Sequence, residues 1–400
     1  MTQLHIPAGI NYECSGCGNC CLEWPVPLTP QDVSRITSLA AEDTLQSGAV
    51  LFRSLRRSDV KLQSFTNTLE KRNDGRCEFL CADSRCLLHS AWGAEAKPEM
   101  CQLFPYTFTE TPSGIYASLS FASSGALYNF GRALTDQAEV LEERWGLFKC
   151  LFPLVQLDWS SAQLIDGQLL SWTAYLNLEE QILSCITQSG AASRVDLKLD
   201  DARRFIAQAL PAGVDLDCRP KIEASQTAVD QLLLRELFDF YLPDNVFAEP
   251  KSDLNVKALL EQFVAPPCKV QINSGGRAYS FKQLLDYRLG SLDAEAEDLL
   301  FRFVYCRIFS KLYFGAGFAN LSLLAGFNHL IVLVSLVRLK VKMMAQSQQL
   351  NTLGFFAVAE IVRALDRQLS QAALSKQSVA VLEVLLSSPE RIERIFALAA

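Results

Sequence analysis

The sequence predicts a mainly α protein of two domains: a small, irregular α+β domain, followed by a larger all-α domain. Three observations support this prediction. Eight of the thirteen cysteines lie within the first 101 residues. Amphipathic helical stretches, separated by prolines, dominate the rest of the chain. With 400 residues, half of them apolar, the chain is long enough to form two hydrophobic cores. We place the domains at residues 1–135 and 136–400.

Two local signals predict secondary structure in the N-terminal domain. A helix is expected to begin after Thr29, with Pro30 at its first position and Asp32 in its first turn. A β-hairpin is expected where residues 106–109 and 115–119 flank a turn that contains Pro and Gly.

The second domain is predicted to be helical throughout. Between residues 321 and 337 there is no charged residue. This stretch is shorter than the roughly 20 apolar residues that a bilayer helix needs, and Asn328 and His329 lie at its centre. We therefore expect a buried core helix and no membrane span. Amphipathic periodicity predicts the other helices at 136–152, 197–210, 225–241, 294–313, 355–369 and 379–386.

Composition bounds the partners and the location of the protein. A net charge of −7 and a pI of about 5.2 argue against nucleic acid as a partner. The first residues lack the basic and apolar segments of a secretory signal, so a cytoplasmic location is expected. In a reducing compartment, clustered cysteines typically bind metals. Disulfides are the alternative, but the adjacent pair Cys20 and Cys21 would form only a strained bridge.

The clustered cysteines form two groups and one further residue. Thiols at intervals of two to four residues, joined by a distant group, are typical of zinc sites and iron–sulfur clusters. Because either site takes four ligands, the sequence predicts two sites, or one site with supporting thiols. Consecutive side chains usually diverge, so the adjacent pair is expected to serve different metal atoms, or one ligand and one support. The candidates are Cys14, Cys17, Cys20, Cys21, Cys77, Cys81, Cys86 and Cys101, with His89 nearby.

Residues around the cysteines give a weaker signal. Gly16 and Gly18 allow the tight turns of a cluster-binding loop. His89 is a secondary candidate ligand, and a hydrogen-bonding role beside the site is the favoured alternative. His329 is expected to be a satisfied core residue. The isolated cysteines are expected to be buried apolar side chains: Cys150, Cys185, Cys218, Cys268 and Cys306.

This spacing, with the Pro-x2-Cys-x2-Phe-Pro segment that begins at Pro98, resembles the YkgJ-type cysteine-cluster family. The resemblance covers residues 11–110, and the family is described as binding zinc or iron. Cys81 lies outside the usual pattern and is, like His89, a secondary candidate. The ligands that the resemblance implies are Cys14, Cys17, Cys20, Cys21, Cys77, Cys86 and Cys101.

The long helical region after this segment resembles the layout of the flagellin lysine-N-methylases. That resemblance implies methyl transfer from S-adenosylmethionine to a protein lysine, with an iron–sulfur cluster of the 4Fe–4S type involved. No dinucleotide-type glycine motif is present, and Gly315-Ala316-Gly317 is too weak a signal to locate a cofactor. Two alternatives remain open: a non-catalytic zinc- or iron-binding module that recruits a protein partner, and an iron–sulfur electron-transfer protein. The catalytic residues and the oligomeric state are not predicted.

Overall fold

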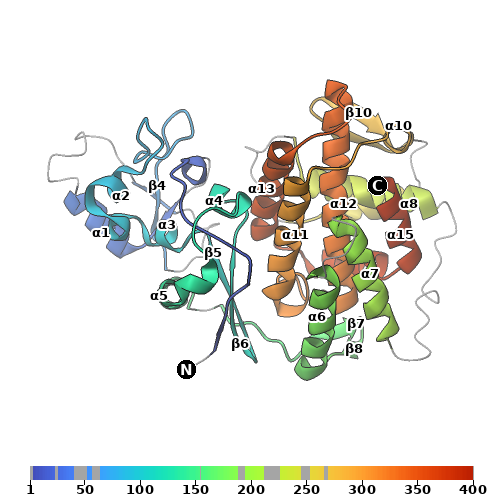
Figure 1. Cartoon of the computed structure of the whole chain (residues 1–400), viewed down its shortest axis with the longest axis horizontal. Helices are drawn as coiled ribbons and strands as arrows, with labels where there is room; N and C mark the ends of the chain where they lie inside the picture. Colours follow the sequence, from blue (N-terminus) through green and yellow to red (C-terminus); the bar gives the residue numbers. More distant parts are fainter. Residues whose placement is uncertain are drawn as a thin grey trace. The chain divides into compact units, whose positions relative to one another are not determined.

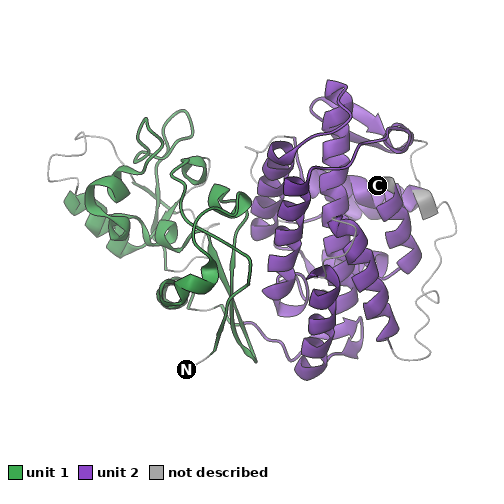
Figure 2. Ribbon diagram, viewed as in Figure 1, with its two compact units in different colours: residues 1–156 green, residues 157–400 purple. Residues whose placement is uncertain are grey.

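The chain divides into two compact units, Met1–Gln156 (unit 1) and Leu157–Ala400 (unit 2) (Figure 2). Figure 1 shows short strands and helices in unit 1 and long helices in unit 2, which confirms the predicted mainly α class. The computed structural model describes residues 3–22, 26–39, 52–55, 64–153, 155–187, 194–210, 226–244, 253–264 and 269–399.

One sheet of unit 1 joins the start of the chain to its second half. β1 (Leu4–His5) pairs in parallel with β6 (Gly114–Leu119), and β6 pairs antiparallel with β5 (Tyr106–Thr111). The β5–β6 pair confirms the predicted hairpin. The central position of β6 holds the N-terminal segment against residues that follow the last clustered cysteine.

A second sheet of unit 1 leads into the predicted helix. β4 (Asn67–Leu69) lies between β2 (Pro27–Leu28) and β3 (Phe52–Ser54), antiparallel to both. α1 (Pro30–Leu39) follows β2 directly. Its start is stabilised by Thr29, whose Oγ1 accepts a hydrogen bond from the backbone N–H of the third helical residue at 3.1 Å. The predicted helix start is confirmed.

The boundary between the units differs from the predicted one because α5 (Ala138–Leu151) belongs to unit 1. Phe108 of β5 packs against Trp145 and Phe148 of α5, with ring centroids 5.7 and 5.9 Å apart. The boundary therefore follows Gln156 instead of residue 135. The other short helices of unit 1 are η1 (Asn19–Cys21), α2 (Leu87–Trp92), η4 (Ala94–Ala96), α3 (Glu99–Leu103), α4 (Ser124–Leu127) and η5 (Leu134–Gln137).

Unit 2 is a helical assembly, and all the helices predicted from periodicity are present at nearly the predicted positions. Each has one face buried against its neighbours, as amphipathic helices require. The helices are α6 (Trp172–Thr187), α7 (Val195–Gln208), α8 (Gln226–Tyr241), α9 (Val256–Val264), α10 (Phe281–Asp286), α11 (Ala294–Phe309), η7 (Gly315–Gly317), α12 (Leu323–Gln348), α13 (Phe355–Gln371), α14 (Lys376–Leu386) and α15 (Pro389–Ala399).

α12 runs through the centre of unit 2 and contacts α7, α8, α13, α14 and α15 (Figure 1). Among the described helices it alone is long and apolar enough to cross a membrane, and 94% of its most apolar window is buried inside the structure. Gly326 lets α12 approach the preceding segment, because a Cβ there would lie 2.1 Å from the Tyr313 carbonyl oxygen. The predicted buried core helix is confirmed.

The all-α prediction for the second domain needs one correction, because unit 2 also contains two small hairpins. They are β7 (Gln163–Ile165) with β8 (Gln168–Leu169), and β9 (Gln271–Ser274) with β10 (Arg277–Ser280). The β9–β10 turn is a Gly-Gly pair in which both residues have positive φ, 59° and 72°. Such a pair suits a two-residue hairpin turn, and was the sequence signal for this element.

Candidate metal centre

The first two cysteine groups are joined by backbone hydrogen bonds. The Cys21 carbonyl oxygen accepts hydrogen bonds from the Cys77 N–H and from the Lys71 ammonium, both at 3.0 Å. A tight turn between Lys71 and Cys77 places these two residues opposite each other, and Gly75 (φ 79°) forms part of that turn. Residues more than fifty positions apart in sequence are therefore held side by side.

A second turn brings Cys86 back to the same region. The Cys81 N–H donates to the Arg85 carbonyl at 2.8 Å, and Leu80 and Cys86 form an isolated antiparallel bridge. Cys86 then caps the start of α2, and its carbonyl accepts hydrogen bonds from the Ser90 N–H and Oγ, both at 2.9 Å. The backbone thus fixes where the Cys86 side chain begins.

The position of Cys101 depends on a buried carboxylate. Asp32 is fully buried, and its Oδ1 accepts a hydrogen bond from the Glu99 N–H, at the start of α3, at 3.1 Å. Arg35 pairs with Asp32 and donates to the Lys97 carbonyl at 2.8 Å. α1 therefore positions the helix that carries Cys101. The sequence pointed to Asp32 only as a helix-start residue and gave no signal for this second role.

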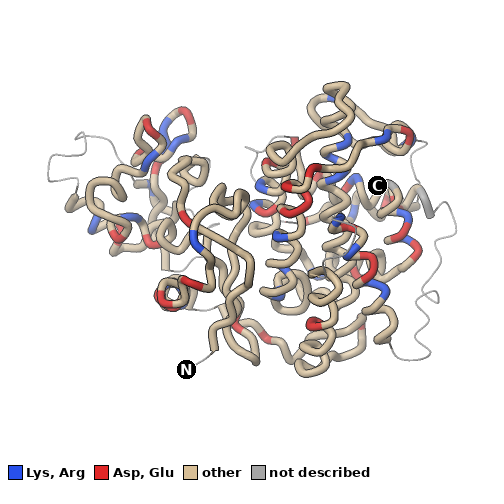
Figure 3. The backbone as a smooth tube through the Cα atoms, viewed as in Figure 1, with Lys and Arg blue, Asp and Glu red and all other residues tan. Residues whose placement is uncertain are grey.

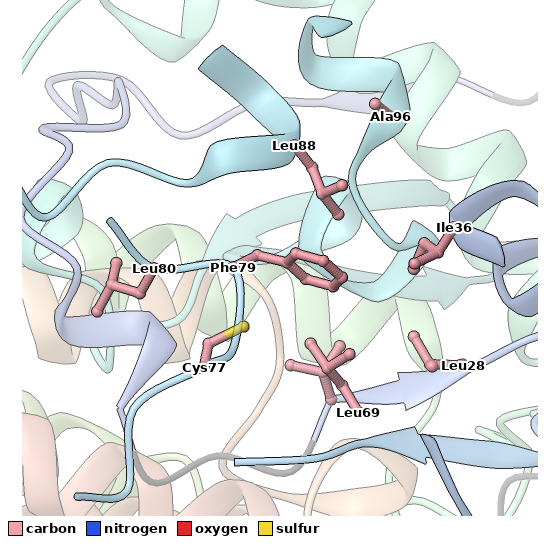
Figure 4. Packing of buried hydrophobic residues seen from close by; sticks show 9 residues of the cluster. Leu28, Ile36, Leu69, Cys77, Phe79, Leu80, Leu88 and Ala96 are labelled. Carbon is pink, nitrogen blue, oxygen red and sulfur yellow. The ribbon is translucent and has the colours of Figure 1, made fainter. Parts of the chain in front are cut away.

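An apolar cluster lies beneath the thiols. Figure 4 shows the Phe79 ring between Leu88 and Leu69, with the Cys77 side chain beside it. Cys77 is part of this cluster, and Cys21, Cys86 and Cys101 pack against it. Burying these side chains removes water from one side of the site, where charges interact more strongly. The remaining buried members of the cluster are Val26, Leu28, Ile36, Leu80 and Ala96.

Five thiols are close enough to influence one another electrostatically, and we call them the inner thiols: Cys20, Cys21, Cys77, Cys86 and Cys101. They come from three separate segments of the chain. Together they form the largest group of interacting thiols in the described part of unit 1.

The inner thiols differ in their pKa values. A hydrogen bond from the Cys21 thiol, helped by Lys97 and Lys71, lowers the pKa of Cys20 to about 6. The same hydrogen bond, together with burial, raises the pKa of Cys21. Burial also raises the pKa of Cys77 and of Cys101. The two adjacent side chains therefore do not diverge as expected: the 3-10 turn of η1 leaves them in contact.

Cys14 and Cys17 are exposed, and we call them the outer thiols. They lie in a loop whose glycines, Gly16 and Gly18, have positive φ values of 64° and 71°. A Cβ at Gly18 would lie 3.1 Å from Leu80 Cδ1, so the end of this loop packs closely on the segment between the inner cysteines. Both glycines thus have the turn-forming role that the sequence predicted.

The secondary candidates lie at the edge of the site. Cys81 interacts with the exposed Arg85, and it is not among the inner thiols. The His89 side chain is exposed, and burial together with Lys97 lowers its pKa. The structure therefore gives neither residue the surroundings of the inner thiols.

The remaining histidine and cysteine predictions have mixed outcomes. His329 is buried in α12 as expected, but its Nε2 has no hydrogen-bond partner among the described residues, so it is not a satisfied core residue. Cys306 is buried, Cys185 is half-buried and Cys150 is exposed, so the prediction is wrong for Cys150. Gly315 and Gly317 pack against Trp159. Cys218 and Cys268 lie outside the described residues.

The donor set fits a soft metal, although the side chains are not arranged around one. In the described ranges, no three Cys, His, Asp or Glu side chains form a group that would hold a metal ion. The described cysteines are all free thiols. Five thiols converge beside Lys71 and Lys97, whose charges favour thiolates, the ligand form that zinc and iron require. Side-chain rearrangement would have to complete the coordination.

Comparison with known families identifies the same part of the chain. Residues 13–121 match the family model CxxCxxCC, described as "Putative zinc- or iron-chelating domain". No curated protein and no solved structure matches the chain. The matched segment lies within unit 1 and contains the inner thiols, the outer thiols, Cys81 and His89. The resemblance to a zinc- or iron-binding cysteine-cluster family is therefore confirmed for this segment.

Proposed function

We propose that unit 1 binds zinc or iron through the inner thiols. The observation that supports this most directly is their convergence: three segments, distant in sequence, bring five thiols to one partly buried place. An apolar cluster alone would not need thiols at these positions. The family match over residues 13–121 supports the same function.

The surrounding residues would assist binding in two ways. Lys71 and Lys97 would offset the negative charge that several thiolates bring to a small volume. Phe79 and its apolar neighbours would exclude water from the metal–sulfur bonds. A bound metal would supply a cross-link between the three segments and, if it were an iron–sulfur cluster, an electron carrier.

For the whole chain, we propose a protein-lysine N-methyltransferase that uses S-adenosylmethionine. The proposal rests on the resemblance to the flagellin lysine-N-methylases, and the layout of a cysteine-rich unit followed by a helical unit supports it. The substrate would be a lysine on a partner protein. The chain would have to orient the lysine amine in line with the sulfonium methyl group and take up its proton.

Metal content tests the first proposal. The protein is purified without oxygen, its zinc, iron and acid-labile sulfide are measured, and its visible absorption spectrum is recorded. We expect zinc or iron bound to the wild type, and Cys77→Ser to lose it. Cys150→Ser, which changes an exposed cysteine away from the inner thiols, is the control and should keep the metal. A wild type without either metal contradicts the proposal.

Binding and transfer assays test the second proposal. We expect S-adenosylmethionine to bind, and labelled methyl groups to appear on lysines of an added protein such as flagellin. A metal-loaded protein without affinity for S-adenosylmethionine would instead support a non-catalytic module. A reversible redox couple without methyl transfer would support electron transfer.

A further inference from the structure

The outer thiols differ from the inner thiols in how the chain holds them. Cys14 and Cys17 are exposed, whereas Cys77 is buried and the other inner thiols are partly buried. No backbone hydrogen bond joins residues 14–17 to the rest of the described chain. Backbone that lacks hydrogen bonds moves at a small free-energy cost. The outer thiols can therefore change position without breaking the structure around the inner thiols.

Both ends of this loop are fixed. The Glu13 N–H donates to the Phe130 carbonyl at 2.7 Å, which ties the start of the loop to the segment after α4. The Gly18 carbonyl accepts from the Cys21 N–H at 2.9 Å, which ties its end to η1 and the first inner thiols. The loop is thus a short tether that keeps the outer thiols next to the inner site while leaving them open to solvent.

The inner thiols are poorly placed to meet a metal ion from solution. Cys77 is part of the apolar cluster, and Cys21, Cys86 and Cys101 pack against that cluster. Five inner thiols also exceed the four ligands that a zinc site or an iron–sulfur cluster takes from the protein. The outer thiols are therefore not needed to complete one site, and their exposure calls for a separate role.

We propose that Cys14 and Cys17 form an exchange site, which captures a thiophilic divalent metal ion from solution and passes it to the inner thiols. This inference rests on the proposed metal-binding function. The two residues stand in a Cys-x2-Cys arrangement, which lets two thiolates hold one metal ion. The ion would then move by exchange of one thiolate ligand for another, without release into solvent.

The exchange balances without an oxidant or a reductant. In each step a bond forms between the metal and an inner sulfur, while one bond between the metal and an outer sulfur breaks. The proton of the entering inner thiol passes to the departing outer thiolate, directly or through water. The oxidation state of the metal does not change. After the last step the outer thiols are free again.

Zinc transfer measures this role directly. The metal-free protein is mixed with Zn²⁺, and the loaded protein is then mixed with an excess of a coloured zinc chelator, under reducing conditions. For the double variant Cys14→Ser/Cys17→Ser we expect the same final zinc content as the wild type. We expect loading and release to be slower by at least about tenfold, which corresponds to about 1.4 kcal/mol of activation free energy.

The matched control is Cys150→Ser, which removes an exposed thiol of unit 1 on α5 and should leave both rates unchanged. If the double variant loses its zinc as completely as Cys77→Ser does, the outer thiols are permanent ligands and the inference is overturned. Unchanged rates overturn it too. A wild type that binds no zinc or iron contradicts the proposed function itself, which separates the two failures.

Alkylation of the zinc-loaded wild type gives a second readout, independent of variants. We expect Cys14 and Cys17 to react with iodoacetamide as fast as the exposed Cys150, and the inner thiols to be protected, as read by mass spectrometry of peptides. Protection of Cys14 and Cys17 equal to that of Cys77 would show that they stay bound to the metal, and would overturn the inference.

Discussion

Unit 2 buries its charged groups as pairs within the protein, whereas unit 1 buries thiols whose proposed partner comes from outside. In unit 2, Arg338 of α12 pairs with Asp196 of α7 at 3.1 Å and with Glu297 of α11 at 2.6 Å. Figure 3 shows the same mixture of signs along the helices of unit 2. The inner thiols of unit 1 have no such matching groups, so their arrangement makes sense only with a metal.

The apolar cores differ in the same direction. α12 is buried along most of its length and contacts five other long helices, which gives unit 2 a continuous apolar interior. The apolar cluster of unit 1 contains few large side chains, and one of its members is Cys77. Burial of apolar surface is the main stabilising contribution in soluble domains. Unit 2 therefore folds on its own residues, and unit 1 depends on its ligand.

Removal of the metal should have the largest effect and would test this comparison most directly. Structural zinc contributes roughly 10 kcal/mol or more to small metal-dependent domains. With a strong chelator under reducing conditions, we expect hydrogen exchange to accelerate in residues 64–121 and to stay slow in α12. Equal protection of both regions with and without metal would contradict the dependence of unit 1 on its ligand.

Gly326→Ala tests the packing of unit 2. The new Cβ would lie 2.1 Å from the Tyr313 carbonyl oxygen, and backbone cannot move aside cheaply. We expect a loss of about 3 kcal/mol in the free energy of unfolding, measured by denaturant titration. The control is Gly146→Ala in α5, where no atom lies within 4 Å of the new Cβ. It should stabilise unit 1 by roughly 0.5–1 kcal/mol. A destabilised control, or an unaffected Gly326 variant, would contradict this account.

Asp32→Asn tests how unit 1 is held together. The variant keeps the shape but loses the charge that accepts hydrogen bonds from Thr29, Arg35 and Glu99. We expect a loss of about 2 kcal/mol in unit 1 and weaker metal binding, because α3 carries Cys101. Calorimetry and metal titration measure the two effects. Asp74→Asn changes an exposed carboxylate and should alter stability by less than about 0.5 kcal/mol. Equal effects at both positions would contradict a special role for Asp32.

The pH dependence of unit 2 should show the smallest effect. Burial and the nearby Arg307 lower the pKa of His329 from 6.5 to about 3. Between these values the unfolded chain binds a proton at this residue and the folded chain does not, so stability falls as the pH drops. The loss is at most about 1.4 kcal/mol per pH unit. His329→Leu should lack this contribution, and unfolding curves from pH 7 to 4 should diverge from those of the wild type. Parallel curves would contradict the lowered pKa.

Local features of the fold were predictable from the sequence, and long-range ones were not. The start of α1, the β5–β6 hairpin and the amphipathic helices depend on neighbouring residues, and these predictions are confirmed. The assignment of α5 to unit 1 depends on aromatic contacts with β5, which no local pattern reveals. Whether α5 packs forwards or backwards along the chain is decided by tertiary contacts alone.

The candidate site shows the same limit. Spacing and resemblance identified the cysteines, because the ligand types and their intervals are written in the sequence. The division into inner and outer thiols was not predictable, because it depends on which segments the turns and the buried Asp32 bring together. Contact between Cys20 and Cys21 was also missed, since it arises from the 3-10 turn of η1.

The distance along the chain between the inner thiols has a consequence during synthesis. Cys20 and Cys21 are made about 80 residues before Cys101, which takes about 4 to 16 s at usual translation rates. The pairing of β1 with β6 comes later still. For those seconds the first thiols have no partners and are open to oxidation. A newly made chain would therefore benefit from early metal capture, before the last part of its binding site exists.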